Sequence, residues 1–316
     1  MRRVALIYNP ASGQHSARRS SYVQKALAVL RDAGVEAEAL ETHAPGSGKS
    51  LALAAARQGY DAVLACGGDG TVHEALQSLV GTKVALGVVP LGTANALAQN
   101  LGLGRNPVKA VRALLDAKPM EVPVGRIFFQ EQNGAEGWRY FTVAAGIGAD
   151  ALLMSSMDPA LKRRYGYALY ILEAFKIWVT NPFPLFDASF SVNGNGAPRV
   201  EQVSQLLAIR IRSFGGALGV FAPGATLRKK DLSLVAFKTR SRMHYLRFLL
   251  ATVLGRQTFS RTIELLDADA VECRSLKGSK SSVFVEADGE VLGALPARIE
   301  VARETLTLLV PPGAQP

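Results

Sequence analysis

The N-terminal third of the chain alternates short apolar runs with longer segments of helical periodicity, and this alternation is the strongest constraint on the fold. Strands are expected at residues 4–8, 35–41, 62–66 and 84–89, and helices at about 17–33 and 49–58 and from Thr71 and Thr93 onward. Strands that alternate with helices are typical of a parallel sheet with helical crossovers. We therefore predict an α/β first domain.

After Pro119 the pattern changes to short strand-like runs separated by Gly, Pro and Asn. These runs fall at residues 141–144, 188–192, 206–211, 232–237, 283–287 and 298–301. Such a succession favours a largely antiparallel β domain. A chain of 316 residues is long enough for two domains of typical size. We place them at residues 1–122 and 123–316, with a C-terminal tail that can return to the first domain.

One helix is expected within the β domain. Its apolar residues recur at helical spacing and include Tyr167, Tyr170, Ile171, Ala174, Phe175 and Trp178. An apolar stripe of this kind usually packs on a sheet, and a lipid-contacting face is the alternative. Neither this segment nor residues 245–255 reaches the length of about 20 apolar residues that a membrane-spanning helix needs. Residues 4–8 are too short for the core of a signal peptide.

The segment Gly67-Gly68-Asp69-Gly70 directly follows an apolar strand and opens a helix. Its glycines let backbone N–H groups approach a ligand, and the helix start adds a positive partial charge, so the segment is suited to binding phosphate. Thr71 and Glu74 have the spacing of a capping box, which predicts that the helix begins there. An ordinary strand-to-helix turn is the alternative.

Two further loops leave strands in the same way. Gly92, Thr93 and Asn95 follow the fourth strand, and the first strand is followed by Asn9, Pro10, Ala11, Ser12 and Gly13. In a parallel sheet all of these loops emerge at the carboxyl ends of the strands, where they can converge on one ligand. We predict a nucleotide site there.

Residues 46–50, Gly-Ser-Gly-Lys-Ser, resemble the end of a different kind of phosphate loop. That motif needs a glycine at the position that His43 occupies here. Without this glycine the tight turn around the phosphate is not expected. We therefore assign no phosphate site to this segment.

Near the C-terminus, Asp288 and Gly289 follow an apolar run and precede Glu290. Asp-Gly is a common two-residue turn of a β-hairpin, which is the simpler interpretation. The functional alternative is that Asp288 or Glu290 accepts a proton from a substrate hydroxyl group, as carboxylates do in general base catalysis.

The chain carries 36 Lys and Arg against 26 Asp and Glu, a net charge of +10. Nine of the basic residues lie between Arg228 and Arg261, where Asp231 is the one acidic residue. Either this is a solvated face or it is attracted to an anionic membrane surface. Nucleic-acid binding is not expected because no recognition motif is present. The cysteines, Cys66 and Cys273, indicate a reducing compartment rather than a disulfide framework.

Taken together, GGDGT at 67–71, PLGTANALAQNLG at 90–102, AAGIGADA at 144–151 and EADGE at 286–290 resemble the diacylglycerol kinase catalytic-domain family. That family includes bacterial lipid kinases, sphingosine kinases and ceramide kinases. The motifs occur in its order and spacing across nearly the whole chain. The resemblance implies an α/β first domain with a parallel sheet, like that of NAD kinases and phosphofructokinases, then a mainly antiparallel β-sandwich domain, with a nucleotide between the two.

The same resemblance implies roles for individual residues. Positions that match the family's ATP-contacting residues are Asn9, Pro10, Ala11, Ser12, Gly13, Thr42, Gly67, Gly68, Asp69, Gly70, Thr71, Val72, His73 and Thr93. Glu290 corresponds to the family's proton acceptor and Asp288 to a catalytic aspartate. Asp69 would contact the Mg²⁺ that accompanies ATP. Asp150 is similar to an aspartate that contacts the lipid headgroup in sphingosine kinases, with a turn-capping role as the alternative.

Two positions depart from the family. Residues 92–97 read GTANAL, which is closer to sphingosine kinases than to the GTxND of many bacterial members, so the identity of the lipid stays open. Where bacterial members hold a structural Mg²⁺ through an aspartate, this chain has Lys229. We predict that this second metal is absent and that the ammonium group of Lys229 or Lys230 supplies its positive charge.

The expected function is that of an ATP- and Mg²⁺-dependent kinase that phosphorylates the hydroxyl group of a diacylglycerol-like lipid. Such an enzyme would act in lipid metabolism from the cytoplasm, with transient contact to the membrane. The alternatives are a sphingoid-base kinase, a small-molecule kinase similar to NAD kinases, and a catalytically silent nucleotide or lipid carrier.

Overall fold

The computed structural model describes residues 1–10, 16–131, 133–157, 167–192, 198–214, 220–256, 259–279 and 282–316. The chain divides into two compact units. Unit 1 comprises Met1–Val124 and Arg303–Pro316, and unit 2 comprises Gly125–Ala302. Within the described ranges, no helix is both long and apolar enough to cross a membrane.

Unit 1 is built on a sheet of parallel strands. β1 (Arg3–Tyr8) lies between β2 (Glu36–Glu41) and β3 (Ala62–Gly67), and β3 pairs with β4 (Ala85–Pro90). The C-terminal part of β15 (Glu290–Val310) runs parallel to β4 at the other side. Every residue of β3 and β4 is buried, as expected for central strands that are covered on both faces.

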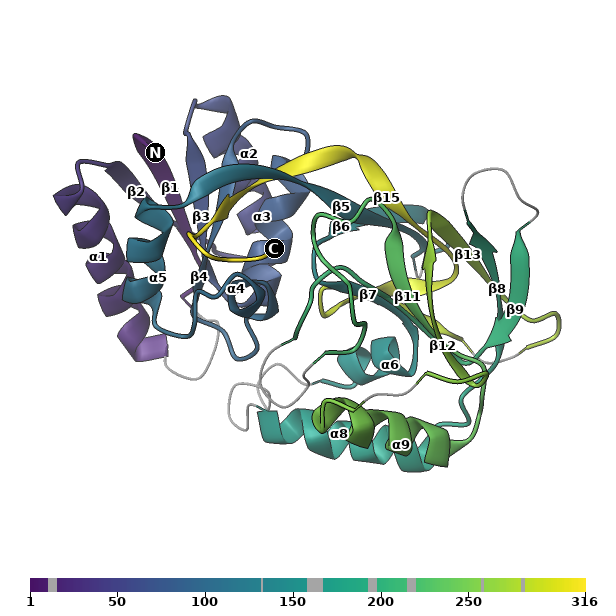
Figure 1. Ribbon diagram of the computed structural model, residues 1–316. Helices are drawn as coiled ribbons and strands as arrows, with labels where there is room; N and C mark the ends of the chain where they lie inside the picture. Colours follow the sequence, from purple (N-terminus) through teal and green to yellow (C-terminus); the bar gives the residue numbers. More distant parts are fainter. Residues whose placement is uncertain are drawn as a thin grey trace. The chain divides into compact units, whose positions relative to one another are not determined.

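Helices cover both faces of this sheet (Figure 1). α1 (Ser16–Asp32) contacts α5 (Pro107–Leu115) on one face, and α2 (Ser47–Arg57) contacts α3 (Asp69–Leu79) on the other. The short α4 (Ala96–Asn100) follows β4. The alternation of strands and helices that the sequence predicted is therefore confirmed.

Helix α5 was not predicted, although its sequence carries a start signal. The side chain of Asn106 accepts hydrogen bonds from the backbone N–H groups of Val108 and Lys109, both at 3.1 Å. Pro107 occupies the first turn. An Asn cap followed by Pro is a common helix N-terminus, so this helix was within reach of sequence reasoning.

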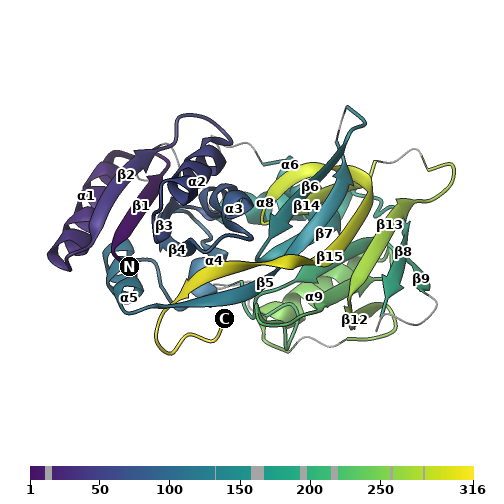
Figure 2. The same ribbon diagram turned by 90° about the horizontal axis from the view of Figure 1, so that it is seen from above.

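Unit 2 is a mainly antiparallel β-sandwich. It contains the N-terminal part of β15 and the C-terminal part of β5 (Lys118–Gln130). Its other strands are β6 (Glu136–Phe141), β7 (Ala144–Gly148), β8 (Phe186–Ser191), β9 (Arg199–Val203), β10 (Gln205–Ile209), β11 (Leu232–Phe237), β12 (Ile263–Ala268), β13 (Ala270–Ser275) and β14 (Phe284–Ala287). β12, β11, β10, β7 and β14 pair in that order, and β9, β8 and β13 lie side by side (Figure 2). Phe141, Phe186 and Phe190 fill the core. The predicted fold class is confirmed.

The strand predicted at residues 141–144 is wrong. β6 ends at Phe141 and β7 begins at Ala144, so the predicted run is the turn between two strands. The backbone N–H groups of Thr142, Val143 and Ala144 all donate to the carboxylate of Asp288. A backbone that wraps around one carboxylate in this way cannot continue as an extended strand.

Unit 2 contains three helices among its described residues, where one was predicted: α6 (Ala149–Ser155), α8 (Tyr167–Thr180) and α9 (Arg242–Val253). The expectation that the aromatic stripe of α8 packs on the sheet is also wrong. Phe175 is 60% exposed, whereas Leu169 and Ile177 are the buried residues of this helix. The side chains of Tyr167 and Tyr170 lie outside the described part of the chain.

Candidate active site

The predicted nucleotide loops meet at one edge of the sheet in unit 1. β1, β3 and β4 are adjacent and parallel, and their registers bring Tyr8 level with Cys66 and Gly67 level with Pro90. The residues that follow these strands therefore lie at the carboxyl edge of the sheet. Ligands of open α/β sheets bind at this edge.

Predicted residues from four segments lie there. Asn9 follows β1, and just after β2 the Thr42 N–H donates to the last carbonyl group of β1 at 2.9 Å. Gly68 follows β3, and Thr93 lies in the loop after β4. The first loop is described only as far as Pro10, and its other predicted residues lie outside the described ranges: Ala11, Ser12 and Gly13.

The loops after β3 and β4 touch through their backbones. A Cβ atom placed on Gly92 would lie 2.4 Å from the Cα atom of Gly68, which is closer than real Cβ atoms approach. The Leu91 N–H also donates to the Gly67 carbonyl at 2.8 Å. Glycine is therefore needed where the loops meet, and the edge presents bare backbone, as close approach to a phosphate group requires.

Asp69 joins the same two loops. Its Oδ2 atom accepts a hydrogen bond from the Asn95 N–H at 2.9 Å, and its Oδ1 atom accepts one from the Ala96 N–H at 2.8 Å. Ala96 is the first residue of α4, so the carboxylate lies at the N-terminus of that helix, where negative charge is stabilising. Because both carboxylate oxygens accept hydrogen bonds from the backbone, Asp69 is suited to hold the loop after β4 in position. Its contact with Mg²⁺ stays a prediction.

The predicted capping box at Thr71 and Glu74 is wrong. α3 begins at Asp69, before Thr71, and Gly68 is its N-cap residue without a side-chain cap. The physical reason is that the Glu74 carboxylate has partners on another helix and does not return to the start of its own.

Those partners lie in residues 46–50, the segment that resembles a phosphate loop. The Gly46 and Gly48 N–H groups both donate to the Glu74 carboxylate at 2.8 Å. Glu74 thus takes the place at the N-terminus of α2 that a phosphate would take in a true phosphate loop. This agrees with the interpretation that the segment is not a phosphate site.

The C-terminal half of the predicted segment 67–73 faces inward. Thr71, Val72 and His73 are all buried. The Thr71 N–H donates to the Gly68 carbonyl at 3.1 Å within the first turn of α3, and His73 contacts Gln77 one turn further on. The part of the segment at the sheet edge is therefore its glycine-rich beginning, residues 67–70.

In unit 2, Asp288 and Gly289 form the hairpin turn that their sequence favours. The two residues join β14 to β15, and their φ angles of 50° and 85° fit a type I′ turn. The Asp288 carboxylate accepts hydrogen bonds from the N–H groups of Val143 at 2.8 Å and Thr142 at 3.0 Å. These bonds hold the carboxylate in one orientation against the turn between β6 and β7.

The two predicted catalytic carboxylates differ in accessibility. Asp288 is 8% exposed, whereas Glu290, at the start of β15, is an exposed residue. A substrate can reach Glu290 directly. Asp288 is better placed to fix the hairpin from which Glu290 projects.

Glu286 is a candidate that the sequence interpretation missed. Its carboxyl group is buried and hydrogen-bonded to Asp150, in the first turn of α6. A Cβ atom placed on Gly146 would lie 2.4 Å from Asp150 Oδ2 and 2.8 Å from Glu286 Oε1. Both carboxyl groups therefore pack against this glycine. The available signal was an acidic residue directly after the apolar run Val283 to Val285 and two positions before Asp288.

A hydrogen bond between two carboxyl groups requires a proton on one of them. Burial raises the pKa of Glu286 well above its usual range, and the neighbouring Asp150 carboxyl group raises it further. Burial also raises the pKa of Asp150. The pair therefore shares a proton under conditions in which exposed carboxyl groups are ionised.

Lys229 lies among oxygen atoms. Its Nζ atom contacts the Asp267 carboxylate, lies 3.5 Å from Asp231 Oδ1 and donates to Ser233 Oγ at 3.1 Å. Lys230 is exposed. Of the two lysines predicted to replace a metal ion, Lys229 is thus the one surrounded by the kind of ligands that a hard cation takes.

Arg210 holds the backbone that carries Lys229. Its side chain is 1% exposed and donates to the carbonyl groups of Lys229 at 2.8 Å and Asp231 at 3.1 Å. Burial lowers the pKa of Arg210 to about 10, which leaves it charged at neutral pH. Nothing in the sequence distinguished this arginine from the surface ones.

Two family models match the chain. The diacylglycerol kinase catalytic domain matches residues 3–127, and the YegS C-terminal NAD kinase beta sandwich-like domain matches residues 142–310. The second match alone spans more than half of the chain. The chain therefore belongs to the diacylglycerol kinase catalytic-domain family, and the resemblance drawn from its motifs is confirmed.

Proteins named diacylglycerol kinase are similar over almost the whole chain. The one from Mycobacterium tuberculosis (strain ATCC 25618 / H37Rv) is 29% identical over 314 residues, which are 98% of this chain and 95% of that protein. The one from Bacillus subtilis (strain 168) is 25% identical over 299 residues, which are 94% of this chain and 92% of that protein.

Solved structures show the same fold. A diacylglycerol kinase from Bacillus anthracis str. Sterne superposes with a TM-score of 0.69 at 19% identity, covering 99% of this chain and 98% of that chain. Yeast NADH kinase complexed with NADH gives a TM-score of 0.53 at 10% identity, covering 98% of this chain and 83% of that chain.

Proposed function

We propose that the protein is a lipid kinase that transfers the γ-phosphoryl group of ATP to the hydroxyl group of a diacylglycerol-like lipid. The observation that carries this proposal is the convergence of the loops after β1, β3 and β4, with bare backbone where Gly68 and Gly92 meet. Membership of the diacylglycerol kinase family and the names of its relatives support the same class of reaction.

The backbone at this edge fits a phosphate group. Gly68 precedes the N-terminus of α3, and the N-terminus of a helix attracts anions through its N–H groups and its dipole. We infer that the backbone around Gly68 and Gly70 holds the phosphates of ATP. Phosphoryl transfer depends mainly on positioning and on neutralisation of charge, and a loop fixed by Asp69 and Gly92 provides positioning.

Mg²⁺ would be held largely by the phosphate groups of ATP and would neutralise their charge. The described residues include no group of three or more His, Cys, Asp or Glu side chains suited to a metal ion. Mg²⁺ commonly takes few protein ligands where phosphates are present. Asp69 is the protein contact proposed for it, in addition to its two hydrogen bonds to the backbone at α4.

On the acceptor side, Glu290 is the proposed proton acceptor for the lipid hydroxyl group. It is exposed at the start of β15, so it is accessible to a substrate. Asp288 would position the hairpin, because its oxygens accept hydrogen bonds from three backbone N–H groups. Asp150 is the proposed contact for the lipid headgroup, with Glu286 holding its carboxyl group in place.

The test is to incubate the purified protein with γ-labelled ATP, Mg²⁺ and a total lipid extract, and to identify the species that gains phosphate. Label in phosphatidic acid is the expected result. Label in sphingoid-base phosphates would identify a sphingoid base as the substrate in place of diacylglycerol. Label confined to water-soluble metabolites would overturn the assignment as a lipid kinase. Nucleotide binding without any labelled product would indicate a carrier.

The role of Glu290 is tested with Glu290→Gln. Loss of a general base is expected to lower kcat by about 10²- to 10⁴-fold, and the melting temperature should stay the same because the residue is exposed. Glu136→Gln is the matched control, since Glu136 is an exposed glutamate at the start of β6. Full activity of both variants would show that Glu290 is not the proton acceptor.

A further inference from the structure

We propose that unit 2 carries a docking surface for an anionic phospholipid bilayer, formed by the exposed apolar faces of α8 and α9 and by the arginines between the ends of these helices. The proposal goes beyond the phosphoryl transfer reaction. Both helices lie along the same side of the unit (Figure 1).

The exposed face of α8 is apolar. Ile171, Leu172, Phe175 and Val179 are 61%, 61%, 60% and 46% exposed. Their spacing places them within an arc of about 100° on the helix. A surface helix of a globular domain usually turns its apolar stripe to the core, so this outward stripe needs an apolar partner.

Helix α9, together with the residue that follows it, also exposes an apolar stripe. Met243, Leu250 and Leu254 are 58%, 52% and 70% exposed, and their spacing places them along one side of the helix. The exposed Arg247 lies in the same stripe, between Met243 and Leu250. An arginine can lay its apolar stem on a hydrocarbon surface and keep its charge at the level of the lipid headgroups.

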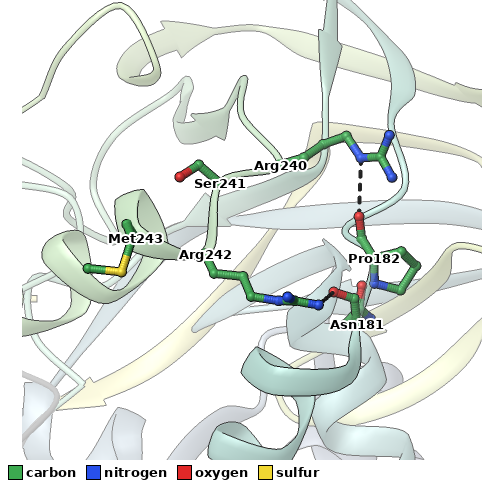
Figure 3. Close-up of a pocket in the computed structure, with 6 residues that line it drawn as sticks. All are labelled: Asn181, Pro182, Arg240, Ser241, Arg242 and Met243. Atoms are coloured by element: carbon green, nitrogen blue, oxygen red, sulfur yellow. Dashed lines mark hydrogen bonds between the residues drawn. The ribbon is translucent and has the colours of Figure 1, made fainter.

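A basic hollow lies where the two helices approach each other (Figure 3). It is lined by Asn181 and Pro182 after α8 and by Arg240, Ser241, Arg242 and Met243 at the start of α9. The Trp178 side chain donates to the Arg242 carbonyl at 2.9 Å, which joins the helix ends. Arg240 donates to the Pro182 carbonyl at 3.2 Å, so its position is fixed while the residue stays exposed.

The positive charge around α9 indicates which partner binds this surface. The sequence contains no Asp or Glu between Asp231 and Glu264, and Arg240, Arg242, Arg247 and Arg256 are all exposed. A second copy of this chain would bring the same positive charges face to face, whereas an anionic bilayer offers both phosphate groups and hydrocarbon. Not every basic residue of this stretch contributes, because Lys238 forms ion pairs with Glu264 at 2.6 Å and Glu201 at 3.2 Å.

The test is co-sedimentation with vesicles of mixed phosphatidylcholine and phosphatidylglycerol, in parallel with vesicles of phosphatidylcholine alone. The full chain should bind the mixed vesicles, and high salt should weaken the binding. The double variant Leu172→Ser with Phe175→Ser should bind at least tenfold more weakly, since each side chain loses its apolar burial. Arg240→Gln with Arg242→Gln should lose about fivefold per arginine, on the anionic vesicles only.

Val200→Ser is the matched control, because Val200 is 62% exposed but lies on β9. All replaced residues are exposed, so the α8 variant and Val200→Ser should keep the wild-type melting temperature. The arginine variant should lose only the exposed hydrogen bonds to the carbonyl groups of Pro182 and Asn181. The proposal is overturned if the wild type does not sediment with anionic vesicles, or if the α8 variant binds them as well as Val200→Ser does. A concentration-dependent dimer that the α8 variant abolishes, without vesicle binding, would assign the surface to a second copy instead.

The vesicle experiment contains no ATP and no substrate, so it is independent of the proposed reaction. A variant that loses vesicle binding should still phosphorylate a short-chain, water-dispersed diacylglycerol at the wild-type rate. If the chain proves to have no kinase activity at all, vesicle binding can still be measured and interpreted.

Discussion

The carboxylate of Asp69 accepts hydrogen bonds from the backbone N–H groups of Asn95, at 2.9 Å, and Ala96, at 2.8 Å. It thereby ties the glycine-rich loop after β3 to the loop after β4, and the contact between Gly68 and Gly92 completes the joint. The two segments that the sequence predicts as separate phosphate loops therefore form one structural unit. A substitution in one loop should alter the conformation of the other.

Asp69→Ala is expected to destabilise the protein by about 2 kcal/mol, because it leaves two partly buried N–H groups without their acceptor. It should also weaken nucleotide binding. Asp69→Asn keeps one acceptor oxygen and should have a smaller effect. Urea unfolding and titration with a fluorescent ATP analogue measure both quantities. Asp32→Ala, at the exposed end of α1, is the control. Equal results for Asp32→Ala and Asp69→Ala would contradict the conclusion that Asp69 holds the two loops together.

The contact between the glycines gives a graded prediction. A Cβ atom on Gly92 would lie 2.4 Å from backbone, whereas one on Gly68 would lie 3.3 Å from backbone. Gly92→Ala should therefore lower the melting temperature and the nucleotide affinity clearly more than Gly68→Ala does. The two can be compared by thermal unfolding with and without ATP. The opposite order would show that the close approach is not what requires glycine here.

Local patterns identified most of the elements of unit 1, because a period of two or of 3.6 residues is written in the sequence itself. The contacts of the candidate site are of another kind. The bond from the Gly48 N–H to Glu74 joins residues 26 positions apart, and the bond from Val143 to Asp288 joins residues 145 apart. Local rules also fail where such contacts compete with them: a capping box was expected at Glu74, but two N–H groups of α2 bind its carboxylate.

Helix α8 shows a second limit of sequence reasoning. Its periodicity establishes that an apolar stripe exists, but the direction of the stripe depends on what the rest of the fold leaves uncovered. Leu169 and Ile177 face inward, and Phe175 faces outward. The pairing of Asp150 with Glu286 was out of reach for the same reason, since it depends on how α6 and β14 meet.

Lys229 yields a prediction about metal dependence. Lys229→Met would leave the carboxylates of Asp231 and Asp267 without their cation, and the expected loss is about 1 kcal/mol because these groups are partly exposed. Lys229→Asp would bring a third carboxylate into the cluster. Its melting temperature should then rise when Mg²⁺ is added, while the wild type shows no such response.

Lys230→Asp makes the same charge change at a neighbouring exposed position and serves as the control. It should not respond to Mg²⁺. Should the wild type be stabilised by Mg²⁺ as strongly as Lys229→Asp, or should both aspartate variants respond alike, the ammonium group of Lys229 would not be standing in for an ion.

The shared proton of Glu286 and Asp150 predicts how stability depends on pH. The pKa of Glu286 is raised from its ordinary value of 4.5, first by burial and then by Asp150. The native state therefore keeps a proton that the unfolded chain releases. The stabilisation is fully present below pH 4.5 and is lost as the pH rises through the folded pKa. In this range the free energy of unfolding should fall by up to about 1.4 kcal/mol per pH unit.

Glu286→Gln removes this titration while keeping the shape of the side chain and a hydrogen-bond donor for Asp150. Its free energy of unfolding should fall less steeply with pH than that of the wild type, so the variant gains relative stability as the pH rises. Urea unfolding from about pH 5 to about pH 8 measures both slopes. Glu136→Gln, an exposed glutamate, should follow the wild type. If Glu286→Gln also runs parallel to the wild type, the two carboxyl groups do not hold a common proton.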